Sequence, residues 1–139
     1  YGPSRVIAID LDANRAEKAK AFGATDTVLS SDSDWKEQVL ALTDGLGVDV
    51  AVEAVGLPQT FQMCLDMVRP AGRVANVGVH GKPVEFPLQD LWISNISISM
   101  GLVNTNTSAT LLRLLAQHKL PVDEFISHTF RLDEIIEAY

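Results

Sequence analysis

The sequence contains little that could form a covalent or metal-held framework. Cys64 is the one cysteine among 139 residues, so no disulfide can form within the chain. It lies in the apolar pattern of residues 61–65, which is typical of a buried helix face and predicts that the thiol packs in the core. None of the three histidines shows a metal-ligand spacing with this cysteine. The sequence therefore predicts no metal site in this segment.

Basic residues and long apolar runs are also scarce. The chain has 11 Lys and Arg against 18 Asp and Glu, a net charge of −7. This balance argues against a nucleic-acid partner, because binding a phosphate backbone requires basic patches. No apolar run is long enough to span a bilayer, and the first residues lack the basic and apolar regions of a signal peptide. We therefore expect no nucleic-acid partner, no membrane partner and a cytoplasmic location.

Strand-like and helix-like segments alternate along the chain, which has the length and the hydrophobic fraction (47%) of one ordinary globular domain. Such alternation predicts an α/β fold, a Rossmann-like doubly wound parallel sheet. The near-continuous apolar stretches 6–9 and 48–52 favour burial on both faces of the sheet. The expected strands are 5–10, 26–29, 48–55, 73–79, 96–102 and 125–129. The expected helices are 14–22, 35–42, 59–68, 88–93 and 108–118, with a further helix from 132.

An acid ends the first apolar run, Arg5 to Asp10. In a dinucleotide-binding βαβ unit a carboxylate at this place accepts hydrogen bonds from the adenosine ribose hydroxyls, and its charge disfavours the extra phosphate of NADP. The alternative is that Asp10 only starts a loop and caps the next helix. Arg15, in the first turn of that helix, either reaches back over the ribose or is a solvated helix residue.

Two glycines follow the ends of the next strands. Ligands of open α/β sheets bind at the carboxyl ends of the strands, and Gly56 and Gly78 stand where the backbone would pass close to a flat ligand. Taken singly, each is better explained as a turn glycine, but two of them at adjacent strand ends favour a ligand at this edge. The neighbouring valines, Val55, Val77 and Val79, would supply an apolar face for a nicotinamide ring.

Glu53 is an acid inside an apolar strand. A buried carboxylate must be paired or hydrogen-bonded, so we expect Glu53 to anchor a neighbouring loop, with a catalytic role as the alternative. His80 follows in a turn beside Gly81 and is expected to contact solvent.

With these residues in place, the chain resembles the cofactor-binding domain of medium-chain, zinc-dependent alcohol dehydrogenases over essentially its whole length. The stretches that carry the resemblance are RVIAID (5–10), AKAFGAT (19–25), GVDVAVEAVG (47–56), GRVANVGV (72–79) and FISHTFRLDEIIEAY (125–139).

The resemblance implies hydride transfer between an alcohol and NAD, with zinc bound by a separate catalytic domain. Asp10 and Arg15 would hold the adenosine ribose. Ala54, Val55 and Gly56 would line the nicotinamide-side ribose, and Val77, Gly78 and Val79 the nicotinamide. Backbone groups of Ile98 and Ser99 would meet its carboxamide. No catalytic residue and no zinc ligand of the family has a counterpart in this chain.

The family's first strand and its Gly-x-Gly-x-x-Gly turn have no counterpart either. That turn should precede the strand-ending acid by about 20 residues. We therefore expect residues 1–139 to be an NAD(P)-binding domain truncated at its N-terminus, a fragment of a longer protein that is inactive alone. The absent strand belongs between the second and the fourth. Its loss would leave two open strand edges inside the sheet, and we expect a homo-oligomer.

Two other functions remain open. A methyltransferase that uses S-adenosylmethionine also ends its second strand in a ribose-binding acid. A non-catalytic nucleotide-sensing domain could have the same fold, because fold does not fix function.

Overall fold

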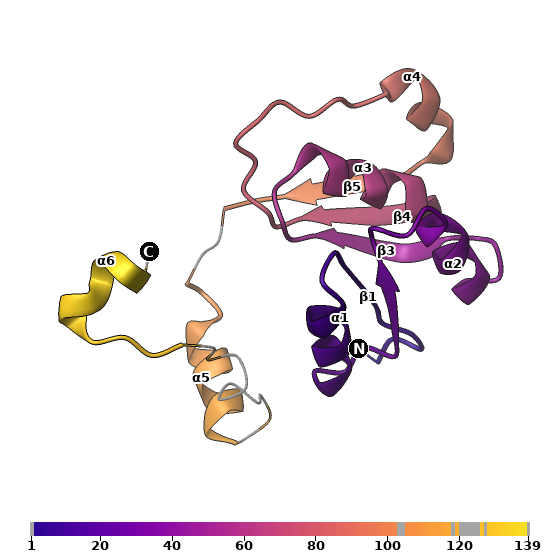
Figure 1. The fold of residues 1–139 in the computed structure, drawn as a ribbon. Helices are drawn as coiled ribbons and strands as arrows, with labels where there is room; N and C mark the ends of the chain where they lie inside the picture. The colour runs from indigo at the N-terminus through magenta and orange to yellow at the C-terminus, as the bar shows by residue number, and fades with distance from the viewer. Residues whose placement is uncertain (1, 103–104, 118, 120–125, 127, 139) are drawn as a thin grey trace. The chain divides into compact units, whose positions relative to one another are not determined.

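A computed structural model of the chain describes residues 2–102, 105–117, 119, 126 and 128–138 (Figure 1). The chain divides into two compact units, residues 1–102 and residues 103–139. The strands formed by the described residues all lie in the first unit. Among the described residues, no helix is long and apolar enough to cross a membrane.

The first unit opens with a parallel strand pair and two helices. Asp12 begins the first helix, because its side chain accepts hydrogen bonds from the backbone N–H groups of Asn14 and Arg15. Gly23 follows the end of that helix with a φ of 103°, in the left-handed region that favours glycine. The elements are β1 (Ile7–Asp10), α1 (Ala13–Ala21), β2 (Asp26–Leu29) and α2 (Trp35–Leu42).

A second sheet holds three strands in the order β3-β4-β5, all parallel. Ala51, Val74 and Ile98 stand side by side across the sheet. Because the strands are parallel, their carboxyl ends lie along one edge of the sheet. The elements are β3 (Val48–Glu53), α3 (Pro58–Met67), β4 (Val68–Asn76), α4 (Leu88–Leu91), the 3₁₀ helix η1 (Trp92–Ser94) and β5 (Ser97–Met100).

The two sheets are separate: β1 pairs with β2, and β3 pairs with β4. In the numbering of a complete Rossmann fold, β1 is the second strand and β3 the fourth. The division therefore falls where the sequence predicts two open strand edges. The α/β class and the parallel strand direction are confirmed. The fold therefore consists of two parallel sheets, not of one continuous sheet.

The core of the second sheet lies under α3, which covers one sheet face (Figure 1). Cys64 is 3% exposed, so its predicted packing in the core is confirmed. Burial raises the pKa of the Cys64 thiol to about 11, which makes it a poor nucleophile. The buried cluster consists of Ala51, Phe61, Cys64, Leu65 and Val74.

The opposite face of β3 differs from the expectation. Side chains alternate between the two faces of a strand, and Val50 and Val52 are 52% and 59% exposed. The expected burial on both faces is therefore found on one face only among the described residues. The apolar composition of 48–52 could not show whether one face or both faces of the strand are buried, because both faces carry apolar side chains.

The expected helices agree with the structure to within about two residues, whereas β4 (Val68–Asn76) both begins and ends earlier than the expected strand 73–79. It starts at Val68, which pairs with Val48, and the register then shifts by a bulge before Arg73 pairs with Val50. In the second unit, the described residues form helices and no strand. These helices are α5 (Ser108–Ala116), η3 (Leu132–Glu134) and α6 (Ile135–Ala138).

The strand expected at 125–129 is not formed by the described part of that segment. Ile126, His128 and Thr129 are outside any strand. Phe125 and Ser127 lie outside the described residues, as does His118, the expected last residue of the helix before it.

Candidate functional site

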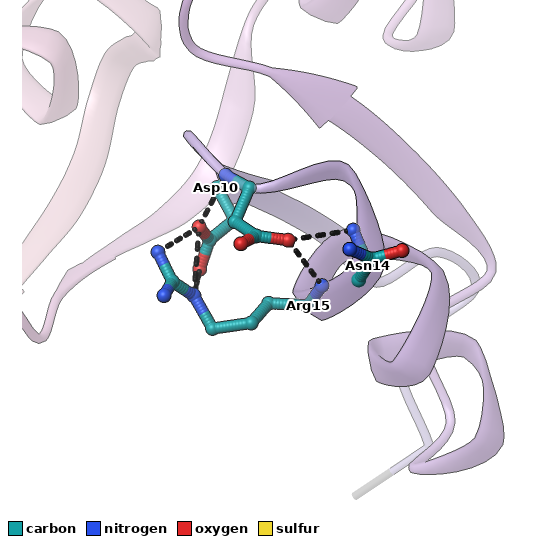
Figure 2. A network of polar contacts seen from close by, with 4 residues as sticks. Asp10, Asn14 and Arg15 are labelled. Atoms are coloured by element: carbon teal, nitrogen blue, oxygen red, sulfur yellow. Dashed lines mark hydrogen bonds and ion pairs between the residues drawn. The ribbon is translucent and has the colours of Figure 1, made fainter.

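Asp10 ends β1, and its carboxylate is bound by Arg15 from the first turn of α1. Figure 2 shows the guanidinium folded back onto the carboxylate. Arg15 Nε lies 3.1 Å from both oxygens and Nη2 lies 2.8 Å from Oδ1, while the backbone N–H of Asp12 donates to Oδ1 at 2.8 Å. Three of the four bonds end on Oδ1. Oδ2 therefore keeps capacity to accept further hydrogen bonds.

This pairing favours the charged form of both side chains at the end of β1. The hydrogen bond from Arg15, followed by that from the Asp12 backbone, lowers the pKa of the Asp10 carboxyl, and Asp10 raises the pKa of Arg15. Both groups are therefore charged at neutral pH. Their side chains are 33% and 67% exposed, so they remain accessible to a ligand. Arg15 thus reaches back to Asp10, and its contact with a ribose stays a prediction.

Two loops follow β3 and β4 and form the second group of predicted site residues. The backbone N–H groups of Val77 and Gly78 donate to the carbonyl of Glu53, at 2.7 and 3.1 Å, and so hold the loops together. Beyond that contact the predicted nicotinamide-side valines are open to solvent: Val55 is 63%, Val77 65% and Val79 87% exposed. All three valines are thus exposed apolar side chains, and their contact with a nicotinamide ring stays a prediction.

Gly56 and Gly78 are required by the contact between these loops. A Cβ at Gly78 would overlap the carboxylate of Glu53 and the backbone nitrogen of Gly56, and a Cβ at Gly56 would overlap the carbonyl of Val79. Gly56 also has a φ of 89°. Backbone therefore packs against backbone at this point, which explains both glycines without a ligand.

Glu53 anchors the first of these loops, as expected. The carboxylate is 1% exposed, and its Oε1 accepts hydrogen bonds from the backbone of Val55 (2.9 Å) and Gly56 (2.8 Å) and from Thr60 Oγ1 (2.6 Å). Burial alone would raise the pKa of Glu53, but the bonds from Thr60, Gly56 and Val55 outweigh burial and lower the pKa. Glu53 is thus a buried, charged anchor.

His80 does not face solvent, so that expectation is wrong. Its side chain is 17% exposed, its ring meets the ring of Phe61 edge to face at 6.0 Å, and its Nε2 lies 2.8 Å from Asn76 Oδ1. Nε2 also lies 3.4 Å from Glu53 Oε2. Asn76 is only four residues away, but the buried neighbours Phe61 and Glu53 come from α3 and β3 and could not be indicated by the local pattern around His80.

Ile98 and Ser99 lie inside β5 and not at its end. The register places them beside Val74 and Ala75, while Met100 lies beside Asn76 at the strand ends. Met100 is 72% exposed. The β5 residue nearest to the loops is therefore one that the sequence analysis did not name, because the boundary of that strand could not be fixed from the sequence.

Among the described residues, no group of three or more His, Cys, Asp and Glu side chains is placed to hold a metal ion. The candidate site consists of the Asp10–Arg15 pair at the end of β1 and the two loops after β3 and β4. Sequence reasoning missed Thr60, Asn76 and His80. The one sequence signal for these residues is that Asn76 is polar within the otherwise apolar segment 74–79.

Comparison with known proteins gives the family. Residues 1–117 match the family described as zinc-binding dehydrogenase. An alcohol dehydrogenase of Cupriavidus necator is 29% identical over 99% of this chain and 39% of its own length. An L-threonine 3-dehydrogenase of Pyrococcus abyssi is 33% identical over 90% of this chain and 37% of its own length.

Solved structures agree. The zinc-dependent alcohol dehydrogenase 2 of Streptococcus pneumonia, in its apo form, superposes with a TM-score of 0.96 at 51% identity and covers all of this chain with 41% of its own. A zinc-binding dehydrogenase from Sinorhizobium meliloti bound to NADP superposes with a TM-score of 0.83 at 26% identity, over 91% of this chain and 38% of its own.

The chain spans about two fifths of the length of the relatives that it matches. The matched part is their cofactor-binding domain, with the same parallel α/β fold. The chain therefore belongs to the zinc-binding dehydrogenase family.

Proposed function

We propose that this chain is the dinucleotide-binding part of an NAD-dependent alcohol dehydrogenase. The observation that carries the proposal is the Asp10 carboxylate, which ends a parallel strand, is partly exposed and keeps an oxygen with capacity to accept ribose hydroxyls. Arg15 would lie beside the same ribose. The family and the fold support a nucleotide ligand at this edge of the strands.

The nicotinamide half would lie against the two loops. Ala54, Val55 and Gly56 would line its ribose, and Val77, Gly78 and Val79 would lie along the ring. The exposed valines fit a flat apolar ring, and the absence of a side chain on Gly56 and Gly78 lets the two loop backbones approach each other closely. Ile98 and Ser99 remain predicted carboxamide contacts, to which the register of β5 adds Met100.

NAD is the favoured cofactor, because a carboxylate at the ribose disfavours a 2′-phosphate. Arg15 weakens that preference, since its charge offsets that of Asp10. The similar structure from Sinorhizobium meliloti is bound to NADP. The discrimination expected from Asp10 is therefore modest.

The bound dinucleotide would supply the hydride acceptor for alcohol oxidation. The residues of this chain would bind and orient it. Asp10 would fix the adenosine end, and the two loops after β3 and β4, which contain Gly56 and Gly78 and are called the glycine loops below, would fix the nicotinamide end. Zinc, which would polarise the alcohol oxygen, is proposed to be bound by the remainder of the whole protein. We propose a cytoplasmic location for that protein, with a small alcohol as its substrate.

Asp10→Asn tests the proposal. Asparagine keeps the size and one acceptor oxygen but loses the charge and an acceptor, so the affinity for NAD⁺ should fall about tenfold, while that for NADP⁺ should change less. Calorimetric titration of the whole protein with NAD⁺, NADP⁺ and S-adenosylmethionine measures this.

Asp26→Asn is the matched control. Asp26 pairs with Arg5 at the other end of the same two strands, so this variant should bind as the wild type does. Unchanged NAD⁺ affinity in Asp10→Asn would refute the ribose role. Binding of S-adenosylmethionine but of neither NAD⁺ nor NADP⁺ would support a methyltransferase. Binding of NAD⁺ or NADP⁺ by a whole protein that oxidises no alcohol would support a nucleotide sensor. The 139-residue chain by itself should oxidise no alcohol.

We also propose that the whole protein is a homo-oligomer. Among the described residues, β5 pairs only on its β4 side, and an open strand edge favours pairing with another chain. An apolar hollow adjoins that strand, lined by Phe61, Val84, Phe86, Ile96, Ile98 and Met100. Light scattering of the whole protein should give a mass above that of the monomer. A monomer at micromolar concentration would contradict the proposal.

A further inference from the structure

A partly buried polar cluster around the buried Glu53 joins the two loops. Its members are Glu53 at the end of β3, Thr60 in α3, and Asn76 and His80 at the end of β4 and in the loop after it. The cluster connects the end of β3, α3 and the end of β4.

Glu53 contacts both loops at once. Oε1 holds the first loop through the backbone of Val55 and Gly56. Oε2 lies over Gly78 of the second loop, where a Cβ would overlap it, and 3.4 Å from Nε2 of His80. Oε2 has no hydrogen-bond partner among the described residues. One carboxylate is thus the point at which the two loops meet.

Asn76 fixes the orientation of His80. The Asn76 amide nitrogen donates to the carbonyl of Gly78 at 3.0 Å, so its oxygen faces the imidazole. The tautomer of His80 with its proton on Nε2 suits that oxygen, which lies 2.8 Å away, and Nε2 also lies 3.4 Å from Glu53 Oε2. Phe61 packs against the ring and keeps it in place. The second loop thus contacts the carboxylate through His80, at 3.4 Å from Oε2 and without a hydrogen bond.

We propose that Glu53 and His80 are positioning residues that set the spacing of the two glycine loops for the nicotinamide half of the cofactor. This rests on the proposed function, in which these loops bind that half and Asp10 binds the adenosine half. Neither residue touches the cofactor. Their effect is transmitted by the loop backbones that they hold, because a displacement of these loops moves Val55, Val77 and Val79 together.

The proposal separates the two halves of the ligand. ADP contains the adenosine and pyrophosphate of NAD⁺ but lacks the nicotinamide riboside, so its binding does not depend on the glycine loops. In Glu53→Gln the amide oxygen can still hold the first loop, but the amide nitrogen meets the N–H of His80, and two donors cannot pair. The NAD⁺ affinity of the whole protein should fall about tenfold in this variant, while ADP affinity stays within about twofold.

His80→Phe and Thr60→Val complete the series. His80→Phe keeps a ring against Phe61 and removes the link to Glu53, so it should give the same loss of NAD⁺ affinity as Glu53→Gln. The double variant should be no weaker than either single variant, because both remove one contact. Thr60→Val removes one of the three bonds to Oε1 and should weaken NAD⁺ binding about threefold.

Asp49→Asn is the control, because Asp49 is an exposed acid on the same strand, paired with Arg69 at 2.6 Å. Calorimetry with NAD⁺ and ADP, at a temperature where urea unfolding shows each variant to be folded, gives the comparison. Equal losses of NAD⁺ and ADP affinity, additive single variants, or unchanged NAD⁺ affinity would overturn the positioning role while leaving the proposed function intact. A wild-type protein that binds neither NAD⁺ nor ADP would overturn both.

Discussion

Gly78→Ala should lower the free energy of unfolding by about 2–3 kcal/mol. The new methyl group would overlap the Glu53 carboxylate and the backbone of Gly56. Neither can move away easily, because Glu53 is held by three hydrogen bonds and Gly56 is part of the backbone contact. Urea unfolding followed by circular dichroism measures the change.

Glycines elsewhere in the chain supply the controls. Gly81 is near Gly78 in sequence, and a Cβ there meets nothing within 4 Å, so Gly81→Ala should change stability by less than about 0.5 kcal/mol. Equal effects at positions 78 and 81 would show that the close contact is not what requires glycine.

Gly56→Ala and Gly23→Ala separate backbone strain from overlap. Both residues have positive φ, 89° and 103°, which costs a residue with a Cβ about 1–2 kcal/mol. At Gly56 a Cβ would also overlap the Val79 carbonyl, whereas at Gly23 it would meet nothing within 4 Å. Gly56→Ala should therefore be the more destabilising by about 1–3 kcal/mol. Equal losses would leave strain as the whole effect.

Much of the fold follows from short-range patterns. Hydrophobic periodicity and terminal glycines placed α1, α2 and α3 to within a residue or two, because these signals lie inside each helix. The extent of β4 and the open face of β3 could not be predicted in this way. Strand length depends on the register with a neighbour, and burial depends on what covers the sheet.

The candidate site shows the same limit. Asp10 and Arg15 are five residues apart, so a strand end followed by a helix start was sufficient to place them together. The glycines could be located at strand ends but not explained, since Gly78 is required by Glu53 and Gly56 of another loop. His80 was assigned to solvent because its turn is polar, while its buried partners Glu53 and Phe61 come from β3 and α3.

Glu53→Ala should lower the free energy of unfolding by about 3–4 kcal/mol at pH 7. The change leaves two backbone N–H groups and the Thr60 hydroxyl without their buried acceptor. Asp49→Ala on the same strand is the control. It removes an ion pair whose acid is 80% exposed, which contributes less than about 1 kcal/mol.

The loss of unfolding free energy in Glu53→Ala should also depend on pH, and the direction of the pKa shift of Glu53 decides whether the loss grows or shrinks toward acid pH. Its pKa in the folded protein lies below the ordinary value of 4.5, so the unfolded chain binds the proton first as the pH falls. The stabilisation by the carboxylate is then complete above about pH 5 and is lost as the pH decreases through the folded-state pKa. Urea unfolding of wild type and Glu53→Ala should give a constant difference from pH 7 to 5 and a smaller one at pH 4. A difference that grows toward acid pH would mean that Glu53 is protonated in the folded protein, and the hydrogen bonds to Val55, Gly56 and Thr60 would then be made by a neutral acid.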